Sequence, residues 1–233
     1  MKQFSNRYIF MFATIMVAIV AFVLSSAAMF LQPKQERNAE IEKKRNILAS
    51  VGVMATKNDA EELFDKYVTT SFVLNSSSEL LEDVKAFDVE MKKEQRKPLE
   101  EQFLPVFMAT MDDGTTGFII PLEGKGLWGP IYGYISLKDD LATVNGATFD
   151  HKSETPGLGA EINETWFEDQ FKDKLIFDGN NFTGIIVRKG GADTGDTHAV
   201  DAISGGTITS KALEKMIYDC LIKYVDYLKN NSK

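Results

Sequence analysis

An uncharged apolar stretch near the N-terminus sets the strongest limit on how this chain can fold. Residues 8–31, YIFMFATIMVAIVAFVLSSAAMFL, contain no charged side chain. A helix rises about 1.5 Å per residue, so about 20 apolar residues cross the hydrocarbon core of a bilayer. We therefore predict that residues 1–33 form a membrane anchor rather than part of a globular core.

A cleaved signal peptide is the alternative interpretation of this stretch, with cleavage near Ala27 and Ala28. The apolar region of a signal peptide is usually shorter, about 7–15 residues. The length of the stretch therefore favours an uncleaved single-pass anchor.

The charges that flank the stretch leave its orientation open. Lys2 and Arg7 precede it, but five Lys and Arg residues follow within 34–45. A simple count would place the rest of the chain in the cytoplasm. However, glutamates alternate with the Lys and Arg residues that follow the stretch, as on a solvated helix face. Long domains also cross membranes largely regardless of charge, so the count does not decide the orientation.

Composition limits the classes of function. The 233-residue chain has a net charge of −8, which argues against a nucleic-acid partner because phosphate binding needs a basic surface. The single cysteine, Cys220, cannot form an internal disulfide and excludes a cysteine-based zinc or iron–sulfur site within this chain. His151 and His198 are the two histidines, so we expect no metal site.

The segment 34–110 is interpreted as a helical and mixed connecting region. Residues 34–49 predict a helix that leaves the membrane, and Asn58 or Asp59 could cap a second helix over 59–68. The remainder, 71–105, is charged and mixed, and it gives no clear pattern.

Residues 111–233 have the pattern of strands and helices that is typical of an α+β domain. Three strands are expected near 115–121, 130–138 and 141–150, joined as an antiparallel meander by turns at Asp113–Gly114 and Asp139–Asp140. A helical segment over 161–173, a strand over 182–190 and a helix from about Lys211 complete the domain. The predicted fold class is α+β: one N-terminal transmembrane helix, then an antiparallel-sheet domain with flanking helices.

The last helix is amphipathic. Its apolar residues recur at a helical spacing and share one face. They are Leu213, Met216, Ile217, Cys220, Leu221, Tyr224, Val225 and Leu228. Cys220 is therefore expected to be buried in the core rather than reactive.

A cluster of hydroxyls and glycines, SGGTITS, directly precedes this helix at residues 204–210. Helix N-termini present free N–H groups and a partial positive charge, which bind phosphate well, and glycines allow close approach. The spacing is not that of a P-loop. The alternative is an N-cap with more hydroxyls than a cap needs.

Two other stretches could form a site with this cluster. HKSETPGLGAE, residues 151–161, combines a histidine, a carboxylate and a flexible turn, and GKGLWGP, residues 124–130, places Leu127 and Trp128 between glycines. The alternatives are a turn capped by Glu154 and an ordinary core tryptophan. Each stretch alone is a weak signal.

In this order the three stretches resemble the family of covalent FMN-binding domains, and within it the C subunits of sodium-translocating NADH:quinone reductases. The G subunits of Rnf electron-transport complexes share most of the pattern. The family's flavinylation motif is Asp-x-x-Ser/Thr-Gly/Ala-Ala-Thr. Asp201, Ser204, Gly205 and Thr207 match it, and Gly206 departs from the usual alanine.

The resemblance implies that the domain over 111–233 binds FMN and that Thr207 is the covalent acceptor, through a phosphoester. Asp201 would serve recognition by the modifying enzyme or fix the turn. No catalytic residue and no metal ligand is implied. The other residues expected to line the cofactor are Ser204, Gly205, Gly206, Thr209, Glu154, Thr155, Gly157, Leu158, Leu127 and Trp128.

The implied function is electron transfer in a bacterial inner-membrane assembly of six subunits that couples NADH oxidation by quinone to sodium export. A flavin transferase would load the FMN from FAD with magnesium, and the domain would face the periplasm, against the charge count. The alternatives are an Rnf-type G subunit, a membrane-anchored anion-binding module without a redox role, and an interaction protein in which the hydroxyls only cap a helix.

Overall fold

One helix, α1 (Asn6–Ala49), runs through both the apolar stretch and the charged segment after it, and it includes Pro33. The computed structural model describes residues 5–232 of the chain. Within that range α1 is the one helix long and apolar enough to cross a membrane. Contacts divide the chain into two units, one ending at Lys43 and one beginning at Lys44, so that the last turns of α1 belong to the second unit.

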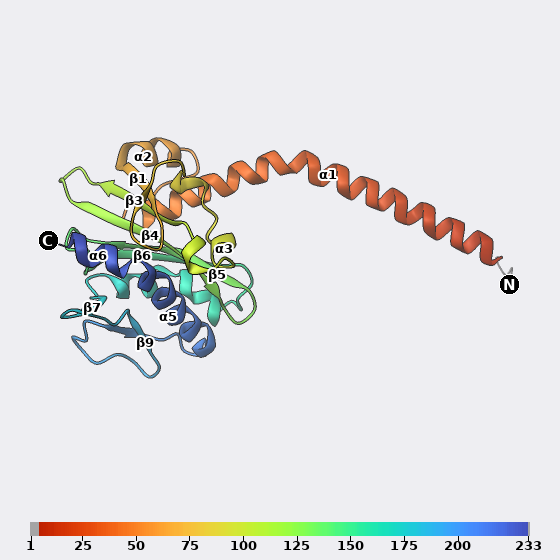
Figure 1. Ribbon diagram of the computed structural model, residues 1–233. Coiled ribbons are helices and arrows are strands. Elements are labelled where there is room, and N and C mark those ends of the chain that lie inside the picture. The colour runs from red at the N-terminus through yellow and green to blue at the C-terminus, as the bar shows by residue number, and fades with distance from the viewer. Residues whose placement is uncertain (1–4, 233) are drawn as a thin grey trace. The chain divides into compact units, whose positions relative to one another are not determined.

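The second unit is built on a six-stranded antiparallel sheet with the order β2-β1-β3-β4-β5-β6. Figure 1 shows this sheet crossing the middle of the unit. Its strands are β1 (Val68–Leu74), β2 (Leu80–Leu81), β3 (Leu104–Thr110), β4 (Thr116–Lys125), β5 (Pro130–Leu137) and β6 (Val144–His151). The meander predicted from residue 115 onward is confirmed as β4, β5 and β6.

The central strand β4 is buried on both faces. Phe118 and Ile120 pack into one hydrophobic core, whereas Ile119 between them packs into a second core. Successive side chains of a strand point to opposite faces, so the run GFIIPL supplies both cores at once. A sheet covered on both faces explains why this strand reads as continuously apolar.

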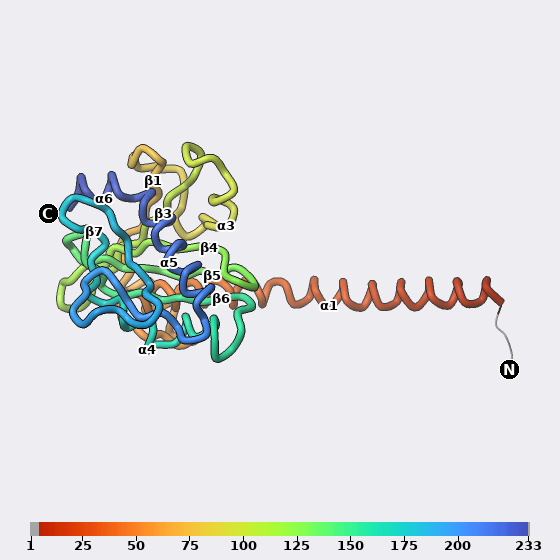
Figure 2. The backbone as a smooth tube through the Cα atoms, turned by 90° about the horizontal axis from the view of Figure 1, so that it is seen from below, coloured from red at the N-terminus to blue at the C-terminus, as the bar shows by residue number. Residues whose placement is uncertain are grey.

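Helices cover the two faces of the sheet. The larger core lies under α5 (Thr207–Leu221), η5 (Ile222–Tyr224) and α6 (Val225–Asn231). The smaller core lies under the last turns of α1 and α2 (Ala60–Tyr67). In Figure 1, α2 and α5 lie on opposite sides of the sheet, and Figure 2 shows the same unit turned by 90°.

The amphipathic face predicted for the last helix is confirmed. Leu213, Met216, Ile217, Cys220 and Leu221 are buried, and α5 makes its main contacts with β4. The helix begins at Thr207, four residues before the predicted Lys211.

The sheet also differs from the sequence expectations in two places. The segment 71–105, which gave no clear pattern, contributes parts of β1 and β3 and the whole of β2, so the sheet begins well before residue 111. The strand expected over 182–190 is reduced to β9 (Ile186–Arg188), because Gly184, Gly190 and Gly191 adopt positive φ angles on both sides of it.

The remaining elements are short. They are η1 (Ala86–Asp88), α3 (Met91–Glu94), η2 (Leu99–Glu101), η3 (Gly159–Asn163), α4 (Thr165–Glu168), η4 (Asp169–Phe171), β7 (Phe177–Asp178), β8 (Asn181–Phe182) and β10 (Ala199–Asp201). The helix expected over 161–173 is therefore a succession of η3, α4 and η4. β9 and β10 form a separate parallel pair.

The carboxylate of Glu168, at the end of α4, covers the edge strand β6. One of its oxygens accepts a hydrogen bond of 2.6 Å from the Phe149 N–H. Burial raises the pKa of Glu168 to about 7, with help from the nearby Asp169, Asp150 and Glu164, although the Phe149 hydrogen bond opposes the rise.

We expect Glu168 to make the folded state less stable as pH rises from about 4.5 to about 7. In this range the unfolded chain has lost the proton, because its pKa is near 4.5, while the folded chain still holds it. Replacing Glu168 by Gln removes this penalty and keeps an oxygen for Phe149. Relative to the wild type, E168Q should gain stability between pH 4.5 and 7.5, as measured by urea unfolding of the full chain in detergent.

The control is E100Q, which removes an exposed carboxylate that is not among the groups that raise the pKa of Glu168. If the wild type, E100Q and E168Q show parallel pH dependences, the account of Glu168 is wrong.

Candidate functional site

The site predicted from the sequence lies at the N-terminus of α5. Gly206 is the N-cap and Thr207 the first helical residue, and the first hydrogen bond within the helix runs from the Ser210 N–H to the Gly206 carbonyl. The N–H groups of Thr207, Ile208 and Thr209 have no acceptor within residues 5–232. They leave a partial positive charge at this helix end.

The side chain of Thr207 is half-buried, and its hydroxyl makes no hydrogen bond with any residue that the structure describes. The hydroxyl is therefore available for chemistry, unlike those of two neighbours. Thr209 and Ser210 are buried and both donate or accept within the protein.

A tight turn leads into the helix. The Ser210 hydroxyl accepts a hydrogen bond of 3.1 Å from the Ile203 N–H, and the Gly206 N–H donates to the Ile203 carbonyl. Gly205 has a φ of +75°, a left-handed conformation that favours glycine, and Ser204 beside it is exposed. Ser210 thus fixes the loop that precedes the helix.

A buried carboxylate joins the three stretches singled out in the sequence. Glu154 is only 5% exposed. One oxygen accepts a 2.6 Å hydrogen bond from the Thr209 hydroxyl, and the other accepts a 2.8 Å hydrogen bond from the Trp128 N–H. The loop before β5, the loop after β6 and the first turn of α5 therefore meet at one side chain.

The charge of Glu154 is stabilised by neutral donors. Burial raises the pKa of Glu154, but hydrogen bonds from Thr209 and from the backbone of Trp128, Gly129 and Leu127 outweigh burial, so the pKa lies below its usual value. Glu154 is therefore negatively charged at neutral pH.

The loop after Glu154 packs closely against the start of α5. A Cβ atom at Gly159 would lie 2.4 Å from the Thr209 hydroxyl and 2.6 Å from a Glu154 oxygen. The Leu158 side chain lies against Gly205, where a Cβ atom would be 2.5 Å from it. This loop and the turn before the helix thus form one packed unit.

Large apolar side chains at this unit remain exposed to solvent. The exposed fractions are 44% for Leu127, 67% for Trp128, 41% for Leu158 and 61% for Ile208. The alternative that Trp128 is a core tryptophan is therefore wrong. Exposed apolar groups gathered from separate segments are typical of a surface that binds something.

Thr155 and Gly157 lie in the exposed turn between Glu154 and Leu158. The Thr155 carbonyl accepts hydrogen bonds from the N–H groups of Leu158 and Ala160, and the Gly157 N–H donates to the Glu161 carboxylate. The turn is thus held by its own backbone, with the Thr155 side chain facing outward.

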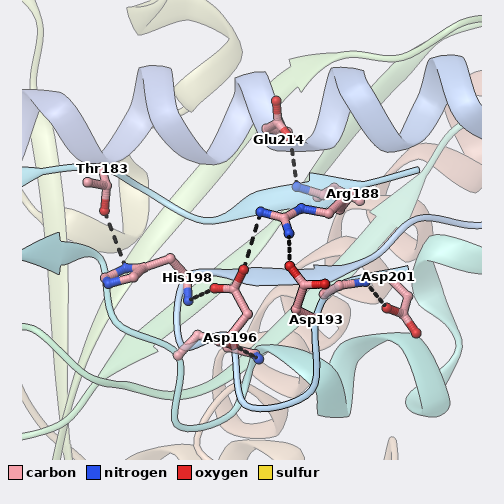
Figure 3. Close-up of polar contacts among 10 residues, drawn as sticks. Thr183, Arg188, Asp193, Asp196, His198, Asp201 and Glu214 are labelled. Carbon is pink, nitrogen blue, oxygen red and sulfur yellow. Dashed lines mark hydrogen bonds and ion pairs between the residues drawn. The ribbon is translucent and has the colours of Figure 1, made fainter. Parts of the chain in front are cut away.

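Asp201 does not join this group. It ends β10, and its carboxylate accepts a 2.7 Å hydrogen bond from the Ala192 N–H in the loop 189–198. Figure 3 shows that bond, with the Arg188 guanidinium between Asp193 and Asp196 of the same loop. The side chain therefore fixes this loop rather than contacting Thr207.

The strand that precedes this loop is tied to α5. Glu214 accepts a 2.6 Å hydrogen bond from the Val187 N–H of β9. At the other end of the loop, the His198 ring contacts the Thr183 hydroxyl at 3.4 Å (Figure 3). The ring also contacts the Leu175 carbonyl at 2.9 Å. Neither histidine takes part in a metal-binding cluster among the residues that the structure describes.

The sequence predicted that the three stretches could form a site, and the structure brings them together at Glu154. The sequence did not single out Gly159, which packs against Glu154 and Thr209, or Ile208, which adds to the exposed apolar surface. The repeated glycines of GKGLWGP and HKSETPGLG indicate close packing in these loops. They could not identify its partners, because a glycine in a loop does not reveal what lies beside it.

Comparisons with known proteins converge on these segments. Residues 126–222 match the family model of the FMN-binding domain, and this range contains Leu127 and Trp128 of the first stretch and all of the other two. The chain is 31% identical to the C subunit of the Na(+)-translocating NADH-quinone reductase of Haemophilus ducreyi, over 84% of this chain and 82% of that protein. It is 30% identical to the same subunit of Vibrio anguillarum, over 88% and 86% of the two chains.

Solved structures agree in fold. The crystal structure of the C subunit of Na(+)-translocating NADH-quinone reductase from Parabacteroides distasonis matches with a TM-score of 0.78 and 38% identity, over 85% of this chain and 96% of that chain. NqrC from Shewanella oneidensis matches with a TM-score of 0.70 and 25% identity, over 84% and 99%. The predicted α+β class, an apolar N-terminal helix followed by an antiparallel-sheet domain, is confirmed.

We expect Gly159→Ala to destabilise the protein by about 1–3 kcal/mol, the usual cost of adding a methyl group to packed side chains. The added Cβ would meet the Thr209 hydroxyl and the buried Glu154 carboxylate, neither of which can move away without losing the other. Urea unfolding of the full chain measures this change.

Gly129→Ala is the matched control. Its Cβ would meet only the end of the exposed Ser153 side chain, which can rotate. Equal effects of the two substitutions would contradict the close packing described at Gly159.

Proposed function

Since this chain belongs to the family of C subunits of the Na(+)-translocating NADH-quinone reductase and contains an FMN-binding domain, we propose that it carries FMN covalently, as a phosphoester on Thr207, and transfers electrons within that reductase. The observation that carries this proposal is the free hydroxyl of Thr207 at the first position of α5, beside the segments joined by Glu154.

The residues present fit the phosphate of such a group. Three N–H groups of the first turn of α5 lack acceptors among the described residues. Backbone donors and the helix dipole stabilise a phosphate at this position. The same first turn supplies the Thr207 hydroxyl, so the attachment point and the donors lie on one rigid element.

The exposed apolar side chains fit the ring of the cofactor. Leu127, Trp128 and Leu158 would border the isoalloxazine, and Ile208 adds an apolar side chain beside Thr207. Thr155 and Gly157, in the neighbouring turn, would lie along the ribityl chain. Ser204, Gly205, Gly206 and Thr209 would surround the phosphate, Thr209 through its backbone because its hydroxyl is bonded to Glu154.

FMN, when bound, supplies the electron-accepting and electron-donating chemistry. The protein's part is to hold the group permanently, to shield it with apolar side chains and to set its potential through nearby charges. We propose that this protein relays electrons between its neighbours in an assembly of six subunits that couples NADH oxidation by quinone to sodium export. It would bind neither NADH nor quinone itself.

Loading of the group requires a partner. We propose that a flavin transferase uses FAD and magnesium to transfer FMN to Thr207. Asp201 would support this step by holding the loop 189–198 through Ala192, which presents the segment before the acceptor in a fixed form.

Protein purified from its own membranes should carry one FMN phosphoester, and the Thr207→Ala variant should carry none. The reason is that Thr207, alone among the described residues of α5, combines a free hydroxyl with a place at the open end of this helix. Intact-mass analysis, peptide mapping and flavin fluorescence of the denatured band on a gel measure the adduct.

Thr70→Ala, at an exposed threonine of β1, is the control and should retain the adduct. Absence of the adduct from native protein would favour a membrane-anchored anion-binding module. Its presence in Thr207→Ala would place the attachment elsewhere and refute the proposal.

We also propose that the chain is a single-pass protein of the bacterial inner membrane, with the domain in the periplasm. The native protein offers little background for thiol labelling, because Cys220 is 1% exposed and burial raises the pKa of its thiol. A cysteine introduced at the exposed Thr194 should therefore react in intact cells with a maleimide that does not cross the inner membrane.

Ser5→Cys, on the other side of the apolar stretch, is the matched variant and should react only after the inner membrane is permeabilised. The opposite pattern of labelling would place the domain in the cytoplasm, as the simple charge count suggests.

A further inference from the structure

Glu154 differs from the other buried carboxylate of this protein. Within residues 5–232 the buried acidic side chains are Glu94 and Glu154. Glu94 is bonded to the Lys97 ammonium at 2.8 Å. Glu154 forms no ion pair with any described residue and is held by N–H and O–H donors alone. Its negative charge is therefore not neutralised by a neighbouring cation.

This charge lies beside the start of α5. Its partner Thr209 is the third residue of the helix, two positions after Thr207. A carboxylate near the first turn of a helix is stabilised by the free N–H groups there. The same helix end would hold the phosphate on Thr207, so the carboxylate is bonded to a residue of the helical turn that carries the attachment point.

The surrounding backbone leaves room for this carboxylate and for little else. A Cβ atom at Gly126 would lie 2.5 Å from one oxygen of Glu154, and one at Gly159 would lie 2.6 Å from the other. Two glycines from different loops thus border the two oxygens. The arrangement is that of a built charge site rather than of a side chain buried by chance.

We propose that Glu154 is a positioning residue with an electrostatic role: it fixes the Trp128 loop to α5, and its charge lowers the reduction potential of a flavin carried on Thr207. The second part rests on the proposed function. Adding electrons near a fixed, poorly screened negative charge is unfavourable. The sequence suggested instead that Glu154 lines the cofactor directly, but both of its oxygens face protein donors.

Three substitutions separate geometry from charge. Glu154→Gln removes the charge but keeps both hydrogen bonds. The amide oxygen of the glutamine can accept from the Trp128 N–H, and its amide N–H can donate to the Thr209 hydroxyl, which accepts as well as donates. Glu154→Ala removes both the charge and the two bonds. Glu164→Gln, at an exposed residue of the same segment, is the control for loss of one negative charge.

The positioning role is tested without the flavin, in full-length chains that carry Thr207→Ala. Trp128 and Trp166 are the two tryptophans, so Trp166→Phe leaves Trp128 as the only tryptophan reporter. The fluorescence anisotropy of Trp128 should decrease in Glu154→Ala, because the released loop moves more freely, and stay near the parent value in Glu154→Gln and Glu164→Gln. Unchanged anisotropy in Glu154→Ala would overturn the positioning role.

The electrostatic role is tested in flavin-loaded protein. The midpoint potential should shift upward in Glu154→Gln and remain near the wild-type value in Glu164→Gln, and the shift should persist at high salt because Glu154 is buried. Equal potentials in the two variants would overturn it, as would a flavin attached elsewhere. The anisotropy result is independent of flavin loading, so a failure of the proposed function and a failure of the positioning role remain distinguishable.

Discussion

The burial of β4 on both faces of the sheet holds the other parts of the domain in place. Because Phe118 and Ile120 face one core and Ile119 faces the other, this strand cannot slip by one residue without exchanging its two faces. The strand also carries the main contacts of α5. A helix fixed along its apolar face to such a strand has a fixed N-terminus, and the attachment chemistry proposed here needs that rigidity.

Two carboxylates show how environment sets charge in this fold. Glu154 and Glu168 are both removed from water, yet the pKa of Glu154 is lowered and that of Glu168 is raised. The difference lies in the partners: Glu154 accepts from a hydroxyl and several backbone N–H groups, whereas Glu168 accepts from one N–H and lies among other acids. The charged carboxylate is the one at the site, and the other covers a sheet edge.

Sequence reasoning reached the meander and the last helix because each leaves a local pattern, whereas the three stretches of the candidate site were singled out because together they resemble a known family. The spacing of Leu213, Met216, Ile217 and Cys220 specifies a helix face without reference to any partner. The segment 71–105 has no such pattern, because β2 has two residues and β1 is largely exposed along its first half. Its membership of the sheet follows from pairing with β3, which no local signal reports.

Residue order alone was enough to specify an apolar span at one end of this chain, an amphipathic helix at the other, and a cluster of hydroxyls and glycines before that helix, in which the family resemblance singles out Thr207. Those features depend on spacing along the chain, which needs no knowledge of distant segments. The folded arrangement was needed to establish that Glu154 faces Thr209 and Trp128 rather than solvent, and that Asp201 turns toward Ala192. A side chain's partners are brought to it from other segments by the packing of the sheet and helices, so its charge state and role are properties of the fold.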